Sequence, residues 1–152
     1  MTRDFLVVRS GGRLLGLPVE HVEETMRPLP CERVPDAPAY VRGVSVVRGL
    51  VTPVVALSEL FGAPTDEAPP ERLVTVRTGE GRRVGLLVHA VLGLRARALA
   101  TDLDLPPLLA DAQRELVAEI GRLDDRLLTV LDATRLVPEA LWNDLESSGD
   151  RT

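Results

Sequence analysis

The chain has 152 residues, of which 45% are hydrophobic and only 3% aromatic, and its net charge is −5. This length suits one compact domain with a core of Val, Leu and Ile, and the acidic balance argues against general nucleic-acid binding. A single cysteine excludes an internal disulfide and fits a reducing compartment. Because no apolar run reaches membrane-spanning length, we expect a cytoplasmic protein that does not insert into a membrane.

The N-terminal residues have the pattern of a β-hairpin. Two apolar runs, Phe5–Arg9 and Leu14–Leu17, flank the turn-forming residues Ser10, Gly11 and Gly12. Short apolar runs separated by glycines are typical of two antiparallel strands joined by a tight turn. The sequence therefore predicts a strand pair at the start of the chain.

A short helix is predicted next. Pro18 fits the first position of a helix, and the spacing of Val19, Val22 and Met26 gives one apolar face, with the glutamates facing solvent. The four prolines in Arg27–Pro38 then exclude regular structure over that segment. We expect a helix followed by an irregular connector.

The next stretch predicts a second hairpin. Its apolar, β-branched runs Val44–Val47 and Leu50–Leu57 are joined by Arg48 and Gly49. Gly49 can adopt the positive φ that two-residue hairpin turns require, so Arg48 is expected at the tip. Pro53 lacks an amide donor and is expected on an edge strand or at a bulge.

The second hairpin is followed by a short helix and a linker. Ser58 lies where an N-cap would, and Glu59–Phe61 make one helical turn that Gly62 closes. The segment Ala63–Glu71 is polar, rich in proline and without periodicity, which is typical of a linker.

Beyond this linker the order of elements repeats. Both halves read as hairpin, helix, connector, hairpin and short helix, which indicates an internal duplication. The matching segments are Leu73–Gly79 with Phe5–Gly11, Arg83–Val91 with Leu14–Val22, Asp125–Leu131 with Arg48–Val55, and Ala133–Leu136 with Ser58–Phe61.

The second half adds four further expectations. Leu92–Leu99 and Glu115–Leu123 read as strands, Pro138–Leu145 as a helix, and Ser147–Thr152 as a frayed tail. The terminal helix would turn three apolar side chains inward, namely Leu141, Trp142 and Leu145.

Five short strands in each half suggest closure into two small barrels, because exposed sheet edges invite unwanted pairing. Barrels of this size are filled by side chains, so we expect a binding site outside them, in the groove between the two units.

Residues suited to catalysis are few and scattered. His21 and His89 are the only histidines, and with Cys31 they do not make a zinc-ligand spacing. Asp124 and Asp125 fall on a predicted turn, where Asp is favoured for backbone reasons. We expect a chain without catalytic activity, metal or cofactor.

The second hairpin and its flanks resemble the CheW-like domain of bacterial chemosensory coupling proteins. The stretch VRGVSVVRGLVTPVVALSELFG carries the residues of that pattern: Val41, Gly43, Val44, Arg48, Gly49, Val51, Pro53, Val54 and Leu57. Three positions depart from it, since Val46 replaces the usual Asn, Ala56 the usual Asp, and His89 another Asp.

This resemblance extends over about Phe5 to Leu145 and implies an all-β fold with short helices. It implies two pseudo-repeated five-stranded β-barrels packed around a shared hydrophobic core. One subdomain would span about residues 5–62 with part of the C-terminal segment, and the other about residues 71–137. The linker would be about 63–71 and the terminal helix about 138–145.

The resemblance also implies a non-catalytic adaptor that links methyl-accepting receptor tips to the regulatory domain of a CheA-type histidine kinase. With no kinase segment attached, the chain is expected to be the coupling protein alone, recruited to receptor arrays. The partner-binding residues would be Arg48, Gly49, Val19, Val22, Leu86 and Val88. One alternative is a divergent copy that serves a non-chemotaxis or accessory chemosensory pathway and has lost or changed one partner. A small β-barrel enzyme or ligand sensor is a further alternative, which no group of residues supports.

Overall fold

A computed structural model gives the fold, and it describes residues 3–10, 12–60, 69–78, 81–97, 117–123, 126–131 and 136–149. Strands dominate it, as the apolar runs predict. The strands are β1 Arg3–Ser10, β2 Arg13–Pro18, β3 Val22–Met26, β4 Val41–Val47, β5 Leu50–Ala56, β6 Arg72–Arg77, β7 Arg83–Val88, β8 Ala90–Arg97, β9 Val117–Leu123 and β10 Arg126–Leu131. The helices are η1 Val19–His21, α1 Leu57–Leu60 and α3 Glu139–Gly149.

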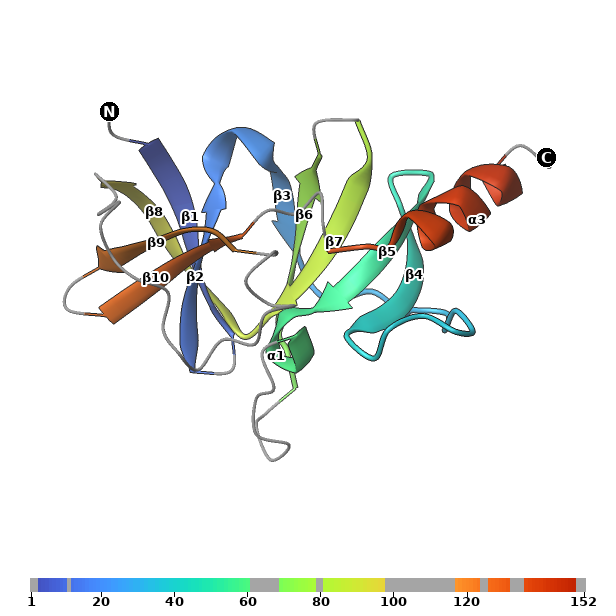
Figure 1. Ribbon diagram of the computed structural model, residues 1–152, viewed down its shortest axis with the longest axis horizontal. Helices are drawn as coiled ribbons and strands as arrows, with labels where there is room; N and C mark the ends of the chain where they lie inside the picture. The colour runs from blue at the N-terminus through green and yellow to red at the C-terminus, as the bar shows by residue number, and fades with distance from the viewer. Residues whose placement is uncertain are drawn as a thin grey trace.

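The strands form two five-stranded sheets that lie side by side (Figure 1). The first has the order β8-β1-β2-β10-β9 and the second the order β3-β6-β7-β5-β4. Most neighbours are antiparallel, but each sheet contains one parallel pair, β2 with β10 and β5 with β7. Within the described residues neither sheet closes into a barrel by strand pairing, so the predicted closure is not seen.

The order of strands bears out the internal repeat. If β1 to β5 are matched in order with β6 to β10, the first sheet's order becomes the order of the second. Each sheet nevertheless draws on both halves, because β1 and β2 join β8 to β10, whereas β6 and β7 join β3 to β5. The sheets therefore do not follow the predicted boundary between residues 5–62 and 71–137. Most of the predicted linker lies outside the described residues.

The predicted helix after Pro18 is wrong. The chain makes only the 3-10 turn η1 and then the strand β3, which pairs antiparallel with β6 from Val22↔Val76 to Met26↔Leu73. Exposure alternates along β3, with Val22, Glu24 and Met26 half-buried and the two residues between them exposed. A period of two fits a strand, and the β-branched valine favours that conformation over a helix.

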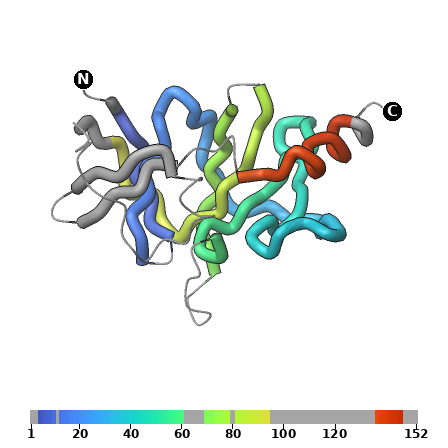
Figure 2. The backbone as a smooth tube through the Cα atoms, viewed as in Figure 1, coloured from blue at the N-terminus to red at the C-terminus, as the bar shows by residue number. Residues whose placement is uncertain are grey.

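The two sheets share one hydrophobic core. It combines buried residues of β1 and β2 with those of β5, β6 and β7, and α1 and α3 cover it. The tube view traces α3 outward to the C-terminal end of the molecule (Figure 2), and Arg82, just before β7, pairs with Glu139 and Glu146 of this helix. Leu141 and Trp142 are each 5% exposed, and Leu145 packs beside them, as predicted for the terminal helix. This helix continues to Gly149, so residues 147–149 are not the tail that the sequence suggested.

Pro53 is not on an edge strand, because β5 pairs with β4 on one side and β7 on the other. The fold tolerates it for two reasons. Pro53 faces Val44, whose amide and carbonyl are both hydrogen-bonded to Glu32 of the connector, so Val44 needs no bond from Pro53. The pairing of β5 with β7 begins one residue later, at Val54. The missing amide of proline therefore costs the sheet no hydrogen bond.

Candidate functional site

The β4–β5 turn places Arg48 at the tip of the hairpin, as predicted. Val47 pairs with Leu50, and the two turn residues between them have positive φ angles, 51° for Arg48 and 80° for Gly49. Positive φ at both central residues is the mark of a type I′ turn, whose twist matches that of the strands. A Cβ on Gly49 would meet no atom within 4 Å, so the backbone angle alone explains the glycine.

Arg48 is held by an acidic residue of β3. Its Nε lies 3.0 Å from Glu24 Oε1 and its Nη2 2.8 Å from Glu24 Oε2, a two-pronged ion pair. The Arg48 side chain remains 72% exposed and that of Glu24 28% exposed. Hydrogen bonding from Arg48 lowers the pKa of the Glu24 carboxyl and raises the pKa of the guanidinium. The arginine is therefore oriented while its outer face stays accessible to a partner.

A second set of ion pairs and hydrogen bonds connects the same hairpin to β3, β6 and β7. Glu23 Oε1 accepts from Arg83 Nε at 2.8 Å, and Glu23 Oε2 accepts from Arg77 Nη2 at 2.9 Å. Arg83 also donates from Nη1 to the Val47 carbonyl at 2.9 Å, next to the turn. Hydrogen bonding from Arg83 is the main cause that lowers the pKa of Glu23. These contacts fix β3 and the hairpin relative to β7.

Exposed apolar side chains surround Arg48. Val46 is 66% exposed, Leu50 55% and Val51 46%, and Val46 faces Val51 across the strand pair. Val46 and Val51 lie on one face of the hairpin, whereas Leu50, which pairs with Val47, lies on the other, so the end of the hairpin exposes apolar side chains on both faces, as contact surfaces often do. We call Val46, Arg48, Leu50 and Val51 the hairpin-tip surface.

The other predicted site residues divide into two groups. Val19 in η1 and Val22 in β3 are half-buried, and Val22 packs against the shared core two residues before Glu24, the partner of Arg48. Leu86 and Val88 were expected to line a groove, but both are 0% exposed in the shared core. They cannot contact a partner in this structure, so their assignment to the site is wrong.

Three parts of the site were not expected from the sequence. Glu24 was read as one of several solvated helix residues, and Arg83 and Glu23 were not connected with the hairpin. The exposed position of Val46 did have a signal, because a valine replaces the polar residue usual in the resembled pattern. Alternation along β4 places it outward between the buried residues Ser45 and Val47.

Two absences concern only the described part of the chain. It contains no cluster of three or more His, Cys, Asp or Glu side chains arranged to hold a metal ion. None of its helices has the length and hydrophobicity needed to cross a bilayer.

Comparison with protein families identifies this arrangement. The model of the CheW-like domain matches residues 4–141, which include both sheets and the hairpin-tip surface. The chain belongs to the CheW-like family. It is thus related to chemotaxis scaffold proteins, a non-catalytic family, as the sequence suggested.

The CheW-like chain has relatives of similar length. It is 30% identical to Chemotaxis protein CheW of Thermotoga maritima over 82% of this chain and 81% of that protein. It is 32% identical to Protein FrzA of Myxococcus xanthus, covering 74% of this chain and 70% of FrzA. The crystal structure of the scaffolding protein TtCheW from Thermoanaerobacter tengcongensis has the same fold, with a TM-score of 0.71 at 23% identity, covering 86% of this chain and 84% of that one.

Proposed function

We propose that this CheW-like protein couples methyl-accepting receptor tips to the regulatory domain of a CheA-type histidine kinase, in the cytoplasm at receptor arrays. Family membership over residues 4–141 supports an adaptor role in general. The hairpin-tip surface is the observation that carries the specific proposal, because it joins an oriented arginine to three exposed apolar side chains. That composition suits a protein partner more than a small molecule.

The hairpin-tip surface would bind through a few anchors. Leu50 and Val51 offer apolar area that a partner can cover, and Arg48 can donate hydrogen bonds to a partner from its exposed outer face. Interfaces commonly depend on such central anchors, with arginine over-represented among them. Val19 and Val22, half-buried in η1 and at the start of β3, would add apolar contact to an amphipathic helix of a receptor.

The three departures from the family pattern differ in their importance. Ala56 is 0% exposed, so a partner cannot touch it. His89 is half-buried between β7 and β8, and its amide donates to the Arg9 carbonyl at 2.9 Å. Only Val46, at 66% exposure, changes the hairpin-tip surface. Any change in partner choice that these departures cause should therefore act mainly through Val46.

A second candidate is an adaptor of another chemosensory pathway. The similarity to Protein FrzA, which has a name of its own within the same family, favours this alternative. The exposed Val46 supports it as well, because a hydrophobic side chain in place of a polar one selects a different complementary surface.

The test is titration of the purified chain against a CheA regulatory domain and a receptor-tip fragment. Arg48→Asn is the sharpest variant, because asparagine tolerates positive φ in a type I′ turn and removes only the charged side chain. We expect at least about tenfold weaker binding to one partner, with only the small loss of melting temperature that follows from removing the exposed ion pair with Glu24. Val22→Ala, checked by thermal melts because Val22 is half-buried, tests the receptor side separately.

Wild-type chain that binds neither partner would refute the coupling proposal. Binding to the homologous pair from a second chemosensory system, with none to the first, would favour the alternative. If Arg48→Asn binds both partners as tightly as the wild type, the arginine is no anchor and the site assignment fails.

A further inference from the structure

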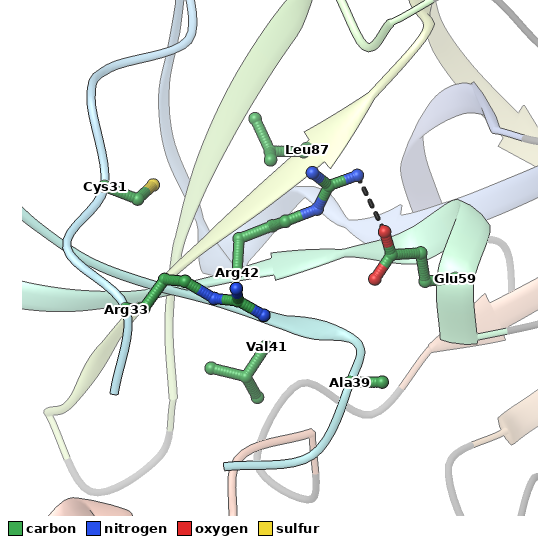
Figure 3. Close-up of a pocket in the computed structure, with 7 residues that line it drawn as sticks. All are labelled: Cys31, Arg33, Ala39, Val41, Arg42, Glu59 and Leu87. Atoms are coloured by element: carbon green, nitrogen blue, oxygen red, sulfur yellow. Dashed lines mark ion pairs between the residues drawn. The ribbon is translucent and has the colours of Figure 1, made fainter. Parts of the chain in front are cut away.

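A pocket of about 490 Å³ opens at the other end of β4 from the hairpin-tip surface (Figure 3). Four parts of the fold meet there: the connector between β3 and β4, the start of β4, α1 and β7. The connector contributes Cys31 and Arg33, β4 contributes Arg42, and α1 contributes Glu59. Of the residues that line the pocket, Val41 alone belongs to the family pattern given above.

The connector wall of the pocket is fixed in place. Glu32 donates its amide to the Val44 carbonyl at 2.9 Å and accepts from the Val44 amide at 2.8 Å. Ser45 Oγ donates to the Pro30 carbonyl at 2.6 Å, so both ends of this short stretch are tied to β4. In extended backbone, residues two apart share a side, which explains why Cys31 and Arg33 both line the pocket.

Gly43 makes this close approach possible. Its φ is 145°, and a Cβ at this position would lie 2.1 Å from the Glu32 carbonyl oxygen. Only glycine therefore allows the connector to lie so close to β4.

The charges in the pocket do not balance. Arg42 Nη2 is 2.7 Å from Glu59 Oε1, and the two side chains are 45% and 38% exposed. Arg33 is exposed and has no hydrogen bond or ion pair within the described part of the chain. Two guanidinium groups and one carboxylate leave one excess positive charge, although the chain as a whole carries −5. The site is thus a local attractor for an anionic group.

The remaining lining is apolar, and its rim is open to solvent. Val41 and Leu87 are 8% and 9% exposed, and the exposed Ala39 lies at the rim. Because Ala39, both arginines and Glu59 are all exposed, a small molecule would remain largely uncovered in this pocket. A side chain that projects from another protein has no such need for enclosure.

We propose that the pocket binds an acidic side chain on a peptide segment of a partner protein. Arg33 supplies planar, two-pronged hydrogen bonding to the carboxylate, and Arg42 adds a second donor when it turns from Glu59. An apolar side chain next to the acidic one would cover Val41 and Leu87. The site is separate from the hairpin-tip surface and does not depend on which partner that surface binds.

The probe is the blocked peptide acetyl-Ala-Leu-Glu-Leu-Ala-amide, titrated into the ¹⁵N-labelled full chain and followed by NMR. Its matched control carries Gln in place of Glu. We expect saturable shifts at the amides of Cys31, Arg33, Arg42 and Leu87, with the Gln peptide about tenfold weaker or more. The Arg33→Ala variant should lose affinity for the Glu peptide by a similar factor. Arg13→Gln removes one cation from β2, in the other sheet, and should change nothing.

Four results would overturn the proposal: equal binding of the two peptides, full binding by Arg33→Ala, shifts confined to the hairpin-tip surface, or inorganic phosphate saturating the same amides as tightly as the peptide. The last result would mean an adventitious anion site only. None of them bears on titration of the kinase domain, so the two proposals can fail independently.

Discussion

Arg48 donates two hydrogen bonds to Glu24, although their elements stand at opposite edges of one sheet, the β4–β5 hairpin at one edge and β3 at the other. The sheet does not close through its backbone within the described residues, so this side-chain pair and the Arg83 contacts bridge the gap. Arg48 and Arg83 therefore connect β3 to the β4–β5 hairpin at the end of the sheet that carries the hairpin-tip surface.

A charge exchange tests whether Arg48 serves partner binding beyond this bridge. Arg48→Glu places two carboxylates together and should lower the melting temperature, whereas the double variant Arg48→Glu with Glu24→Arg should restore it. Partner binding should stay weak in the double variant, because the exposed arginine now projects from β3. Thermal melts and titrations of both variants are the measurement. Restored binding together with restored stability would show that only the ion pair matters.

Gly43 and Gly49 should respond differently to alanine. Both have positive φ, but a Cβ on Gly43 meets the Glu32 backbone while one on Gly49 meets nothing within 4 Å. We expect Gly49→Ala to cost about 1 kcal/mol from backbone strain alone, and Gly43→Ala at least about 2 kcal/mol. Urea unfolding measures both. Equal losses would mean that the connector moves away from β4 at little cost.

Alanine variants of one buried and one exposed leucine distinguish a role in the core from a role in binding. Leu86 is 0% exposed and Leu50 is 55% exposed. Leu86→Ala should lower the free energy of unfolding by about 2–5 kcal/mol, whereas Leu50→Ala should change it by no more than about 0.5 kcal/mol. Binding to the partner of the hairpin-tip surface should weaken only in Leu50→Ala. A destabilised Leu50→Ala variant would argue that the exposed leucine is structural.

Acid should destabilise the protein through its paired glutamates. Arg83 and Arg48 lower the pKa values of Glu23 and Glu24 below their ordinary value of 4.5. A depressed folded-state pKa gives stability that is present above the ordinary value and lost as pH falls through the lowered one. Melting temperatures from pH 6 downward should therefore begin to fall near 4.5 and continue below it, less steeply in high salt. Glu23→Gln should reduce this slope, and an unchanged slope would exclude Glu23 as a contributor.

Trp142 offers an optical probe of how α3 is attached. Arg82 lies 5.0 Å above the centre of its ring and is 3.0 Å from both Glu139 and Glu146. Because Trp142 is the only tryptophan, emission reports this region alone. Arg82→Ala should shift the emission maximum to the red and increase quenching by acrylamide. The Arg82→Lys variant should lie between the wild type and Arg82→Ala in both measurements, because lysine keeps the charge but cannot stack a planar group on the ring. Unchanged emission would show that apolar packing alone holds the helix.

Local patterns in the sequence predicted local structure well. The glycine after Arg48 and the apolar, β-branched runs on either side of it were sufficient for the β4–β5 hairpin, and Leu141 and Trp142 were correctly placed inward. The segment from Val19 to Met26 failed because its apolar spacing fits a helix as well as a strand, and only pairing with β6 decides between them.

The candidate site was less predictable for a related reason. Leu86 and Val88 were assigned by their position in the repeat, but burial depends on which sheet face meets the shared core. Likewise, Glu24 and Arg48 are 24 residues apart, and no sequence pattern shows that the sheet brings them together. Long-range partners follow from strand order, which the order of elements along the chain does not determine.

The exchange of strands between the two halves bears on how such a fold could arise. The β1–β2 hairpin of the first half belongs to the sheet that contains β8, β9 and β10, and the β6–β7 hairpin of the second half belongs to the sheet that contains β3, β4 and β5. Fragments 1–68 and 69–152 should therefore unfold without cooperativity when separate, and cooperative unfolding should return when they are mixed. A single ancestral repeat would likewise need a second copy to complete its sheet, as in a domain-swapped homodimer. Fusion of the two copies then makes assembly intramolecular, which frees folding from its dependence on protein concentration and lets the two hairpin tips diverge toward different partners.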